Sequence, residues 1–471
     1  MSLNPDPAQL SYERLLELVQ LLIAENARLR AEIEQLKRNN ARSAAPFSKN
    51  KRKNHPRRPG RKAGQGSFSN RTAPSEEEYS GPIEDVPVNE TTCPDCGGEL
   101  VGEDQQIVTN TELPPAPKPE VKAYRVHIRS CSGCRRKVRG RHPEVSPDQF
   151  GATAHRLGPR AQAAAATLYY GDGIPQRKVP RVLKSLTGLS VTQGALAQAA
   201  LRLGTDEGAV AQQYQQLRDQ IKEQPAINTD DTGWRVGGQP AQMMVFETKP
   251  VVVYQIRARH RNQEVREVIG DHYEGTLCTD RGKSYEAKEL AEVDQQKCLA
   301  HILRSIDAVL ETKRGRARFF GAVLKSQLQQ AIALYKNFHD PGSKLRDYAS
   351  CVRAIELEVD WHLRPRQLKD RDNHRLLNEL GRHQDRGNLL RFLHSPVTVE
   401  PTNNAAERAL RPAVIARKVS QCSKNERGAA ACSAFKSVIG TLKKSGGDVL
   451  EKLARLIAPS LSPEPASANT S

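Results

Sequence analysis

The sequence predicts an α/β protein in which one core domain follows several smaller modules. Short apolar runs alternate with helical patterns between residues 223 and 446, as is typical of an α/β core. Two Cys-x-x-Cys pairs precede this core, and a seven-residue leucine repeat stands near the start of the chain. The 471 residues are enough for two or three domains, although only 37% of them are hydrophobic. We therefore expect one core with appended polar segments.

The charge of the chain favours a polyanionic partner. The formal net charge is +18, and each phosphate that Lys or Arg neutralises releases condensed counterions. A solvated basic surface is the alternative interpretation. The sequence has no apolar run of about 18 residues and no basic-then-apolar export signal. We expect a cytoplasmic, nucleoid-associated protein that binds DNA and has no membrane contact.

Residues 1–42 have the heptad repeat of a leucine-zipper coiled coil. Leucine recurs every seven residues, at Leu15, Leu22, Leu29 and Leu36. Asn26 falls at a core position of the repeat, where asparagine favours a parallel dimer. A homodimer follows as a hypothesis, and the alternative is an amphipathic helix that packs on its own chain.

Residues 43–82 are predicted to be a basic, disordered linker, because apolar periodicity stops there. Its cluster of positive charge, Arg57, Arg58, Arg61 and Lys62, fits a DNA minor groove. Simple solvated charge explains the cluster equally well.

Residues 83–148 are predicted to form a small zinc-binding module. Its two Cys-x-x-Cys pairs are Cys93 with Cys96, and Cys131 with Cys134. Four thiolates at these spacings suit a tetrahedral, structural Zn²⁺ site. Redox-active pairs or metal-free thiols are the alternatives.

Residues 149–222 form a predicted helical DNA-binding region. Segments 174–186 and 192–203 have the pattern of two helices joined by a short turn at Gly188, with Pro180 able to distort the first. This is compatible with a helix-turn-helix, but any two packed helices have a similar pattern.

The core, residues 223–446, begins with three strand-like runs that predict an antiparallel meander. Asp230 is expected at the end of the first run, and Asp280 at the end of a later run, residues 275–279. A helix at 262–269, a strand at 295–299 and a helix at 300–310 complete the order of a ribonuclease H-like sheet. Loops at strand ends expose side chains to ligands, so both aspartates are candidate site residues.

Glu407 is the third candidate acid. It lies in a predicted helix that Thr402 or Asn403 caps and that Pro412 ends or kinks. Two aspartates and one glutamate can bind two Mg²⁺ or Mn²⁺ ions, which stabilise both oxygens of an in-line phosphoryl transfer. Each acid alone is better explained as a turn or cap residue, so the hypothesis depends on the set.

Four sequence blocks together resemble the insertion-sequence-66 family of bacterial transposases, whose catalytic acids form a DDE triad. The blocks are Thr229-Asp-Asp-Thr-Gly-Trp234, Cys278-Thr-Asp280, Cys298-Leu-Ala-His301 with Arg304, and Asn403-Asn-Ala-Ala-Glu-Arg-Ala-Leu-Arg-Pro412 followed by Arg417-Lys418. The family usually has Asp-Glu-Thr where this chain has Asp230-Asp231-Thr232, and the alignment makes Asp230 the first acid.

The resemblance implies a ribonuclease H-like transposase core with Asp230, Asp280 and Glu407 as the triad and a helical insertion at about 312–398. It also implies cleavage and joining of DNA, with element ends, target DNA and accessory transposition proteins as partners. Residues 447–471 are expected to form a last helix and a disordered tail.

Two further sets of residues remain open. Arg408, Arg411, Arg417 and Lys418 are candidates for binding DNA phosphates, or they form a solvated basic face. Cys298 and His301 are either metal ligands or a packed thiol with a hydrogen-bonded imidazole. The alternatives to a transposase are a zinc-dependent DNA-binding regulator derived from one, and a nuclease of the same fold.

Overall fold

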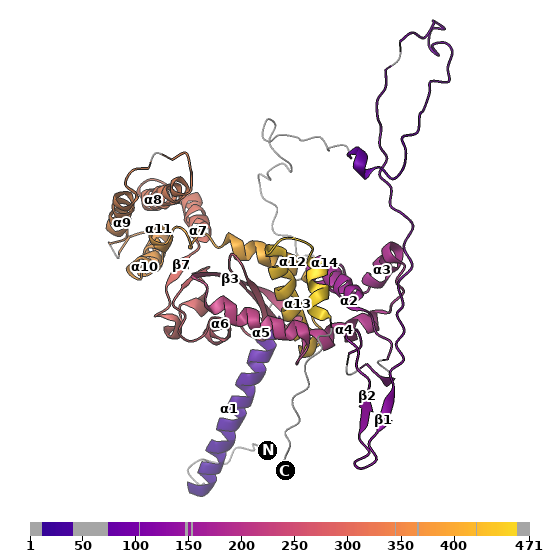
Figure 1. Ribbon diagram of the computed structural model, residues 1–471. Helices are drawn as coiled ribbons and strands as arrows, with labels where there is room; N and C mark the ends of the chain where they lie inside the picture. Colours follow the sequence, from indigo (N-terminus) through magenta and orange to yellow (C-terminus); the bar gives the residue numbers. More distant parts are fainter. Residues whose placement is uncertain are drawn as a thin grey trace, which may run out of the picture.

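The structure is a computed structural model that describes residues 12–40, 74–102, 104–146, 149–151, 154–343, 345–364, 367–420 and 422–458 (Figure 1). Most of the predicted basic linker, with Arg57, Arg58, Arg61 and Lys62, lies outside the described residues. The predicted C-terminal tail after residue 458 lies outside them as well.

The N-terminal modules contain one long helix and one small hairpin. Their elements are α1 (Tyr12–Asn40), the 3₁₀ turn η2 (Glu76–Glu78), β1 (Ile128–Ser130) and β2 (Lys137–Arg139). Helix α1 carries the leucine repeat, and its apolar side chains Val19, Leu22, Leu29 and Ile33 are exposed along it. A helix is therefore present where the zipper was predicted, and its pairing with a second copy stays a prediction.

In the described residues, helical elements follow the hairpin and lead to the sheet. They are α2 (Pro159–Ala166), the π-helical η4 (Thr167–Gly171), α3 (Val179–Thr187), α4 (Gln193–Gly204) and α5 (Ala209–Lys222). Helices α3 and α4 are the predicted pair. Gly188 ends α3 in the left-handed conformation, and the Thr192 side chain caps α4 by accepting from the amide of Ala195. Pro180 lies in the first turn of α3, where a missing amide proton costs little and need not distort the helix.

A five-stranded mixed sheet forms the centre of the core. Its elements in chain order are β3 (Ala226–Val236), β4 (Gln239–Glu247), β5 (Val252–Arg257), α6 (Asn262–Ile269), β6 (Thr276–Thr279), the 3₁₀ turns η5 (Lys283–Tyr285) and η6 (Lys288–Leu290), β7 (Gln295–Lys297) and α7 (Leu299–Thr312). The spatial order is β5-β4-β3-β6-β7. The first three strands form the predicted antiparallel meander, and β6 and β7 join it in parallel.

Two C-terminal helices pack against the meander. Helix α12 (Asn404–Ser420) lies on β3 and β4, α13 (Glu426–Lys444) follows the edge strand β5, and α14 (Val449–Ile457) packs on α2 (Figure 1). Ser437 and Thr441 on α13 accept hydrogen bonds from the amides of Tyr254 and Val252. Helix α13 thereby covers a strand edge that would otherwise be open to pairing with other chains.

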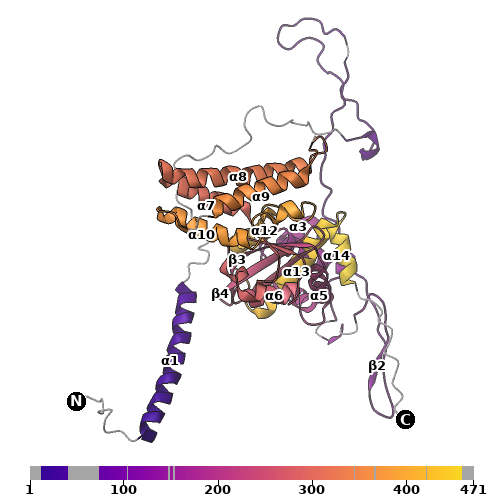
Figure 2. The same cartoon turned by 90° about the vertical axis from the view of Figure 1, so that its left-hand side faces the viewer.

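The predicted insertion is helical. It contains α8 (Arg316–Phe338), α9 (Tyr348–Leu363), α10 (Arg371–Asp385) and α11 (Arg391–His394). Together with α7 these helices form a bundle to one side of the sheet, on the side away from α2 and α3 (Figures 1 and 2).

One local prediction was wrong, and a second was wrong in part. Asp230 does not end its strand, because β3 continues to Val236 and pairs with β4 at nine consecutive residues. Pro412 was predicted to end or kink its helix, and α12 does not end there but runs on to Ser420, while the kink stays a prediction. Proline removes the donor for the carbonyl of Arg408, and because both residues are exposed, water can reach that carbonyl.

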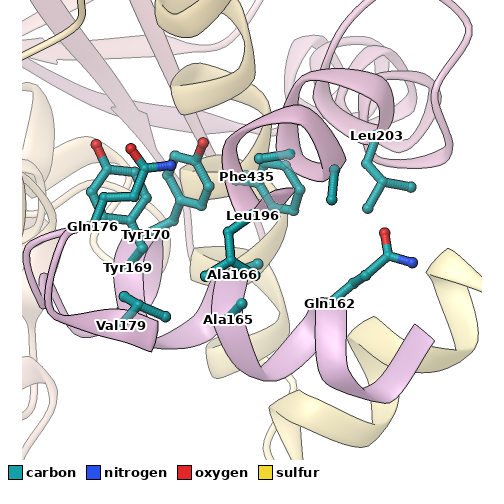
Figure 3. A pocket seen from close by; sticks show the side chains of 12 residues that line it. Gln162, Ala165, Ala166, Tyr169, Tyr170, Gln176, Val179, Leu196, Leu203 and Phe435 are labelled. Atoms are coloured by element: carbon teal, nitrogen blue, oxygen red, sulfur yellow. The ribbon is translucent and has the colours of Figure 1, made fainter. Parts of the chain in front are cut away.

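The helical region is joined to the sheet domain through aromatic packing. Tyr170 of η4 stacks on Phe435 of α13, with ring centroids 4.6 Å apart and ring planes inclined by 2°. Both rings line a small apolar pocket between α2, α3, α4 and α13 (Figure 3). The pocket is continuous with the packing between these helices.

We expect Phe435→Ala to lower the free energy of unfolding by about 3–5 kcal/mol, because it removes a fully buried ring and leaves a cavity. Chemical denaturation measures the change. Phe319→Ala is the matched control, since that ring is 68% exposed, and it is expected to change stability little. An equal loss in both variants would contradict the packing role of Phe435.

Candidate active site

The register of the sheet places Asp230 next to Asp280. Strands β3 and β6 pair in parallel, with Asn228 opposite Cys278. The same register, continued for two residues, puts Asp230 opposite Asp280, which directly follows β6. Strand β3 continues to Val236, whereas β6 ends at Thr279. The two aspartates therefore lie side by side where the pairing of β3 with β6 ends.

Asp280 is held by a local turn. Its Oδ1 accepts a hydrogen bond of 2.8 Å from the amide of Gly282. A Cβ atom at position 282 would lie 2.8 Å from the same oxygen, so a larger residue there would displace the Asp280 carboxylate. The following 3₁₀ turn, η5, places Tyr285 beneath β3, where its hydroxyl lies 3.3 Å from Thr229 Oγ1.

Helix α12 is joined to β3 near both of its ends. The buried Asn403 donates from Nδ2 to the carbonyl of Thr229 at 2.6 Å. Arg417 donates to Thr232 Oγ1 at 2.7 Å, and Ser423 continues beside β3 as a parallel bridge to Val236. Asn403 Oδ1 is buried without a partner, so Asn403 is a tertiary link and not the side-chain cap predicted for α12. These contacts bring Glu407 over β3.

Glu407 lies against the start of α7. Its Oε1 is 3.6 Å from His301 Nε2 and 3.5 Å from Arg304. Burial, followed by the charge of Arg304, lowers the pKa of His301, so the ring is neutral at pH 7. Cys298 accepts from the backbone amide of Asn403 through Sγ at 3.1 Å. Cys298 is therefore a packed thiol that joins α7 to α12.

The carboxyl of Asp230 lies near the other acids. Burial first, and then the carboxylates of Asp231, Asp280 and Glu407, together raise the pKa of Asp230 to about 7, against one backbone hydrogen bond. A group of acids with this mutual repulsion is stabilised by a cation or by a proton.

Asp231 has a different partner. Its Oδ1 lies 3.0 Å from Nδ1 of His260, whose ring packs edge-on against Tyr285. Side chains alternate along a strand, so Asp231 points away from the face of β3 that carries Asp230. This arrangement favours Asp230 as the member of the site.

A fully buried lysine lies below the acids. Lys297, 0% exposed, donates to Thr279 Oγ1 at 3.1 Å and to Gln295 Oε1 at 2.8 Å. The hydroxyl of Thr279 in turn donates to the carbonyl of Asp280. Burial lowers the pKa of Lys297 to about 8, and the charges of Glu286 and Asp280 oppose this shift.

Lys297 and His260 were not predicted from the sequence. A lysine in the polar run Gln295-Gln296-Lys297 has the pattern of an exposed strand, although all three residues are buried. His260 lies in a connecting segment with no motif around it, so the sequence held no signal for its pairing with Asp231.

The structure places the other predicted site residues as follows. Arg408, Arg411 and Lys418 are exposed on α12, whereas Arg417 is partly buried against β3. Cys93 and Cys96 lie in a turn closed by the Thr92–Glu99 bridge, and Cys131 and Cys134 lie in the turn between β1 and β2. Within the described ranges, no three His, Cys, Asp or Glu side chains are arranged to hold a metal ion.

Each cysteine pair contains one thiol with a lowered pKa. Backbone hydrogen bonds from Asp95 and then Cys96 lower the pKa of Cys93. The backbone of Cys134 and then of Gly133 does the same for Cys131. The two pairs are separate in this structure, so the single four-thiolate site stays a prediction.

The mixed five-stranded sheet, with acids from β3, the end of β6 and α12, is compatible with a ribonuclease H-like core. The sequence model of the family described as "Transposase IS66 family" matches residues 155–431, which is more than half of the chain. The protein belongs to the IS66 family of transposases. No curated protein matches the sequence.

Membership of this family confirms the resemblance found in the sequence and implies that the chain binds DNA. The matched residues include all three candidate acids. Among the helices of the described ranges, none has the length and apolar character of a membrane span.

Asp230→Asn is expected to stabilise the fold at pH 8 and to change it little near pH 4. The carboxyl has an ordinary pKa of 3.8 and a folded pKa of about 7, so the unfolded chain releases its proton first. Stability therefore falls as the pH rises between these values and is then level, and asparagine removes that loss. Thermal melts across pH 4–8 measure the difference. A gap that does not widen with pH would contradict the raised pKa.

Proposed function

We propose that the protein is a DDE transposase that cleaves DNA at the ends of an insertion sequence and joins the ends to a target. The observation that carries this proposal is that Asp230 and Asp280 lie side by side where the pairing of β3 with β6 ends, with Glu407 of α12 nearby. Membership of the IS66 family supports it.

The acids fit divalent metal ions of the kind that DDE transposases generally use. All three side chains offer carboxylate oxygens, which Mg²⁺ and Mn²⁺ prefer as ligands. A bound cation would also offset the repulsion between Asp230 and its neighbouring carboxylates. When bound, such ions polarise the phosphate and activate the attacking oxygen. Asp230, Asp280 and Glu407 would hold them, and binding would draw the carboxylates to ligand spacing.

The proposed reaction has two phosphoryl transfers. A water oxygen first attacks phosphorus at the element end, the bond to the 3′ oxygen breaks, and a 3′-hydroxyl and a 5′-phosphate result. The freed 3′-hydroxyl then attacks a target phosphodiester and displaces a second 3′-hydroxyl. The carboxylates of the site orient both steps, and no covalent intermediate with the enzyme forms.

The remaining modules have proposed roles in binding DNA and pairing its ends. The zipper of residues 1–42 would join two protomers, and thereby two element ends. Each cysteine pair has one thiol with a lowered pKa, which favours the thiolate that binds Zn²⁺. A zinc ion bound by both pairs would draw the two turns of residues 83–148 together. Helices α3 and α4, with Arg411 and Lys418, would contact element DNA. Arg417, which donates a hydrogen bond to Thr232 of β3, would place a positive charge for DNA phosphates close to the site.

Asp280→Asn and Glu407→Gln are expected to abolish Mg²⁺-dependent strand cleavage and joining, and to leave binding of end DNA intact. The assay uses the full chain with DNA that carries the flanking ends of its own gene. Asp271→Asn is the matched control, because this exposed acid pairs with Arg266 away from the site.

Three outcomes of this assay discriminate between functions. Joined products that only the site variants lose establish the transposase. Cleavage without joining indicates a nuclease, and binding without cleavage by the wild type indicates a regulator.

We expect the intact protein to be a dimer and the double variant Leu22→Lys, Leu29→Lys to be a monomer. Both leucines are exposed on α1 in the single chain, and lysines at these core positions would repel each other across a dimer seam. Sedimentation velocity measures the change. A double variant that remains dimeric would place the interface elsewhere.

A further inference from the structure

His301 contacts Glu407 of the proposed site from the start of α7. It lies in the first turn of α7, with its Nε2 3.6 Å from Glu407 Oε1. Its other ring nitrogen, Nδ1, is buried and has no hydrogen-bond partner. A buried polar atom without a partner is costly, so the orientation of this ring needs an explanation.

The unpartnered Nδ1 indicates where the ring proton lies. A neutral imidazole has one N–H group and one lone pair. Among the contacts of this ring, the carboxylate of Glu407 is an acceptor for a proton on Nε2. The ring is thus oriented to donate to Glu407, over a distance that must shorten by about 0.5 Å for a normal hydrogen bond.

The backbone around His301 is fixed by the same residues that fix the acids. The amide of Cys298 donates to the carbonyl of Thr279, next to Asp280, at 2.8 Å. The amide of Leu299 donates to the carbonyl of Pro401 at 2.9 Å, just before α12. His301 therefore has a set position relative to both Asp280 and Glu407.

Arg304 contacts the same oxygen of Glu407 but is less able to orient it. Its side chain is 64% exposed, whereas that of His301 is 32% exposed. An exposed, flexible guanidinium provides charge with little directional restraint. Both contacts fall on Oε1, so Oε2 is the oxygen that remains for a metal ion.

We propose that His301 is a positioning residue that holds Glu407 Oε1 and turns Oε2 toward the aspartates. This inference rests on the proposed function, because it requires Glu407 to be a metal ligand. Partners that hydrogen-bond a ligating carboxylate orient it, and their loss costs about 10–100-fold in metal affinity or activity.

The test is Mn²⁺ binding to the full chain, measured by isothermal titration calorimetry. Mn²⁺ prefers carboxylate oxygens to thiolates, which separates this site from the cysteine pairs. His301→Leu is expected to weaken Mn²⁺ binding by about 10–100-fold. His301→Gln, whose amide nitrogen replaces Nε2, should bind close to wild type, and His301→Asn, whose amide falls short at the Nδ1 position, should resemble His301→Leu.

His362→Leu is the matched control. That histidine is also partly buried, and its Nε2 lies 2.9 Å from the carbonyl of Phe320 in the insertion, so its loss should leave Mn²⁺ affinity unchanged. The Gln and Asn variants keep a polar side chain, and their comparison remains decisive if His301→Leu fails to fold.

The outcomes separate the two proposals. If Glu407→Gln loses Mn²⁺ binding while every His301 variant binds like wild type, the positioning role is wrong and the proposed function stands. If Glu407→Gln binds Mn²⁺ like wild type, Glu407 is not a metal ligand and both proposals fail. Weak binding in the Leu and Asn variants, with recovery in Gln, supports the positioning role.

Discussion

The arrangement of the site depends on one buried side chain, Asn403. Asn403 is 1% exposed. Its side-chain Nδ2 donates to the carbonyl of Thr229, beside Asp230, and its backbone amide donates to Cys298 Sγ. Cys298 is joined in turn to Thr279, the residue before Asp280. One residue thus ties together the strand of the first acid, the loop of the second and the helix of the third. The bond to Thr229 requires a side-chain donor that no apolar residue has, and this bond offsets the cost of the unpartnered Oδ1.

The same network explains how like charges are kept together. The half-buried Asp230 lies close to three other carboxylates, and the like charges would move apart in a flexible structure. Here two hydrogen bonds hold the residues that precede the aspartates. Lys297 bonds Thr279, which precedes Asp280, and Tyr285 bonds Thr229, which precedes Asp230. Lys297 is one strand away from the acids and has no carboxylate among its hydrogen bonds. It therefore supports the backbone of Asp280 through Thr279, and its charge acts on the carboxylate without a direct hydrogen bond.

Much of this organisation could be predicted from the sequence, and the exceptions have physical causes. The meander, α6, β6 and α7 follow from apolar periodicity, and Asp280 follows β6 as expected. Asp230 was misplaced at a strand end because the polar run Asn228-Thr-Asp-Asp-Thr232 does not have the pattern of a strand. Pairing with β4 overrides that local preference. Lys297 and the Asp231–His260 pair could not be predicted, because their burial depends on contacts between segments distant in sequence.

The helical insertion packs directly against the segment that carries Asp280. Alternate residues of β6 face different cores, since Leu277 packs in the cluster of the meander and Cys278 in that of α7 to α11. Asp280 therefore follows a strand whose two faces depend on both clusters. Arg281, its neighbour, donates to Glu379 on α10 at 2.8 Å and also bonds Ser305 on α7. A change in the position of the insertion would therefore reach Asp280 through the single peptide bond that joins it to Arg281.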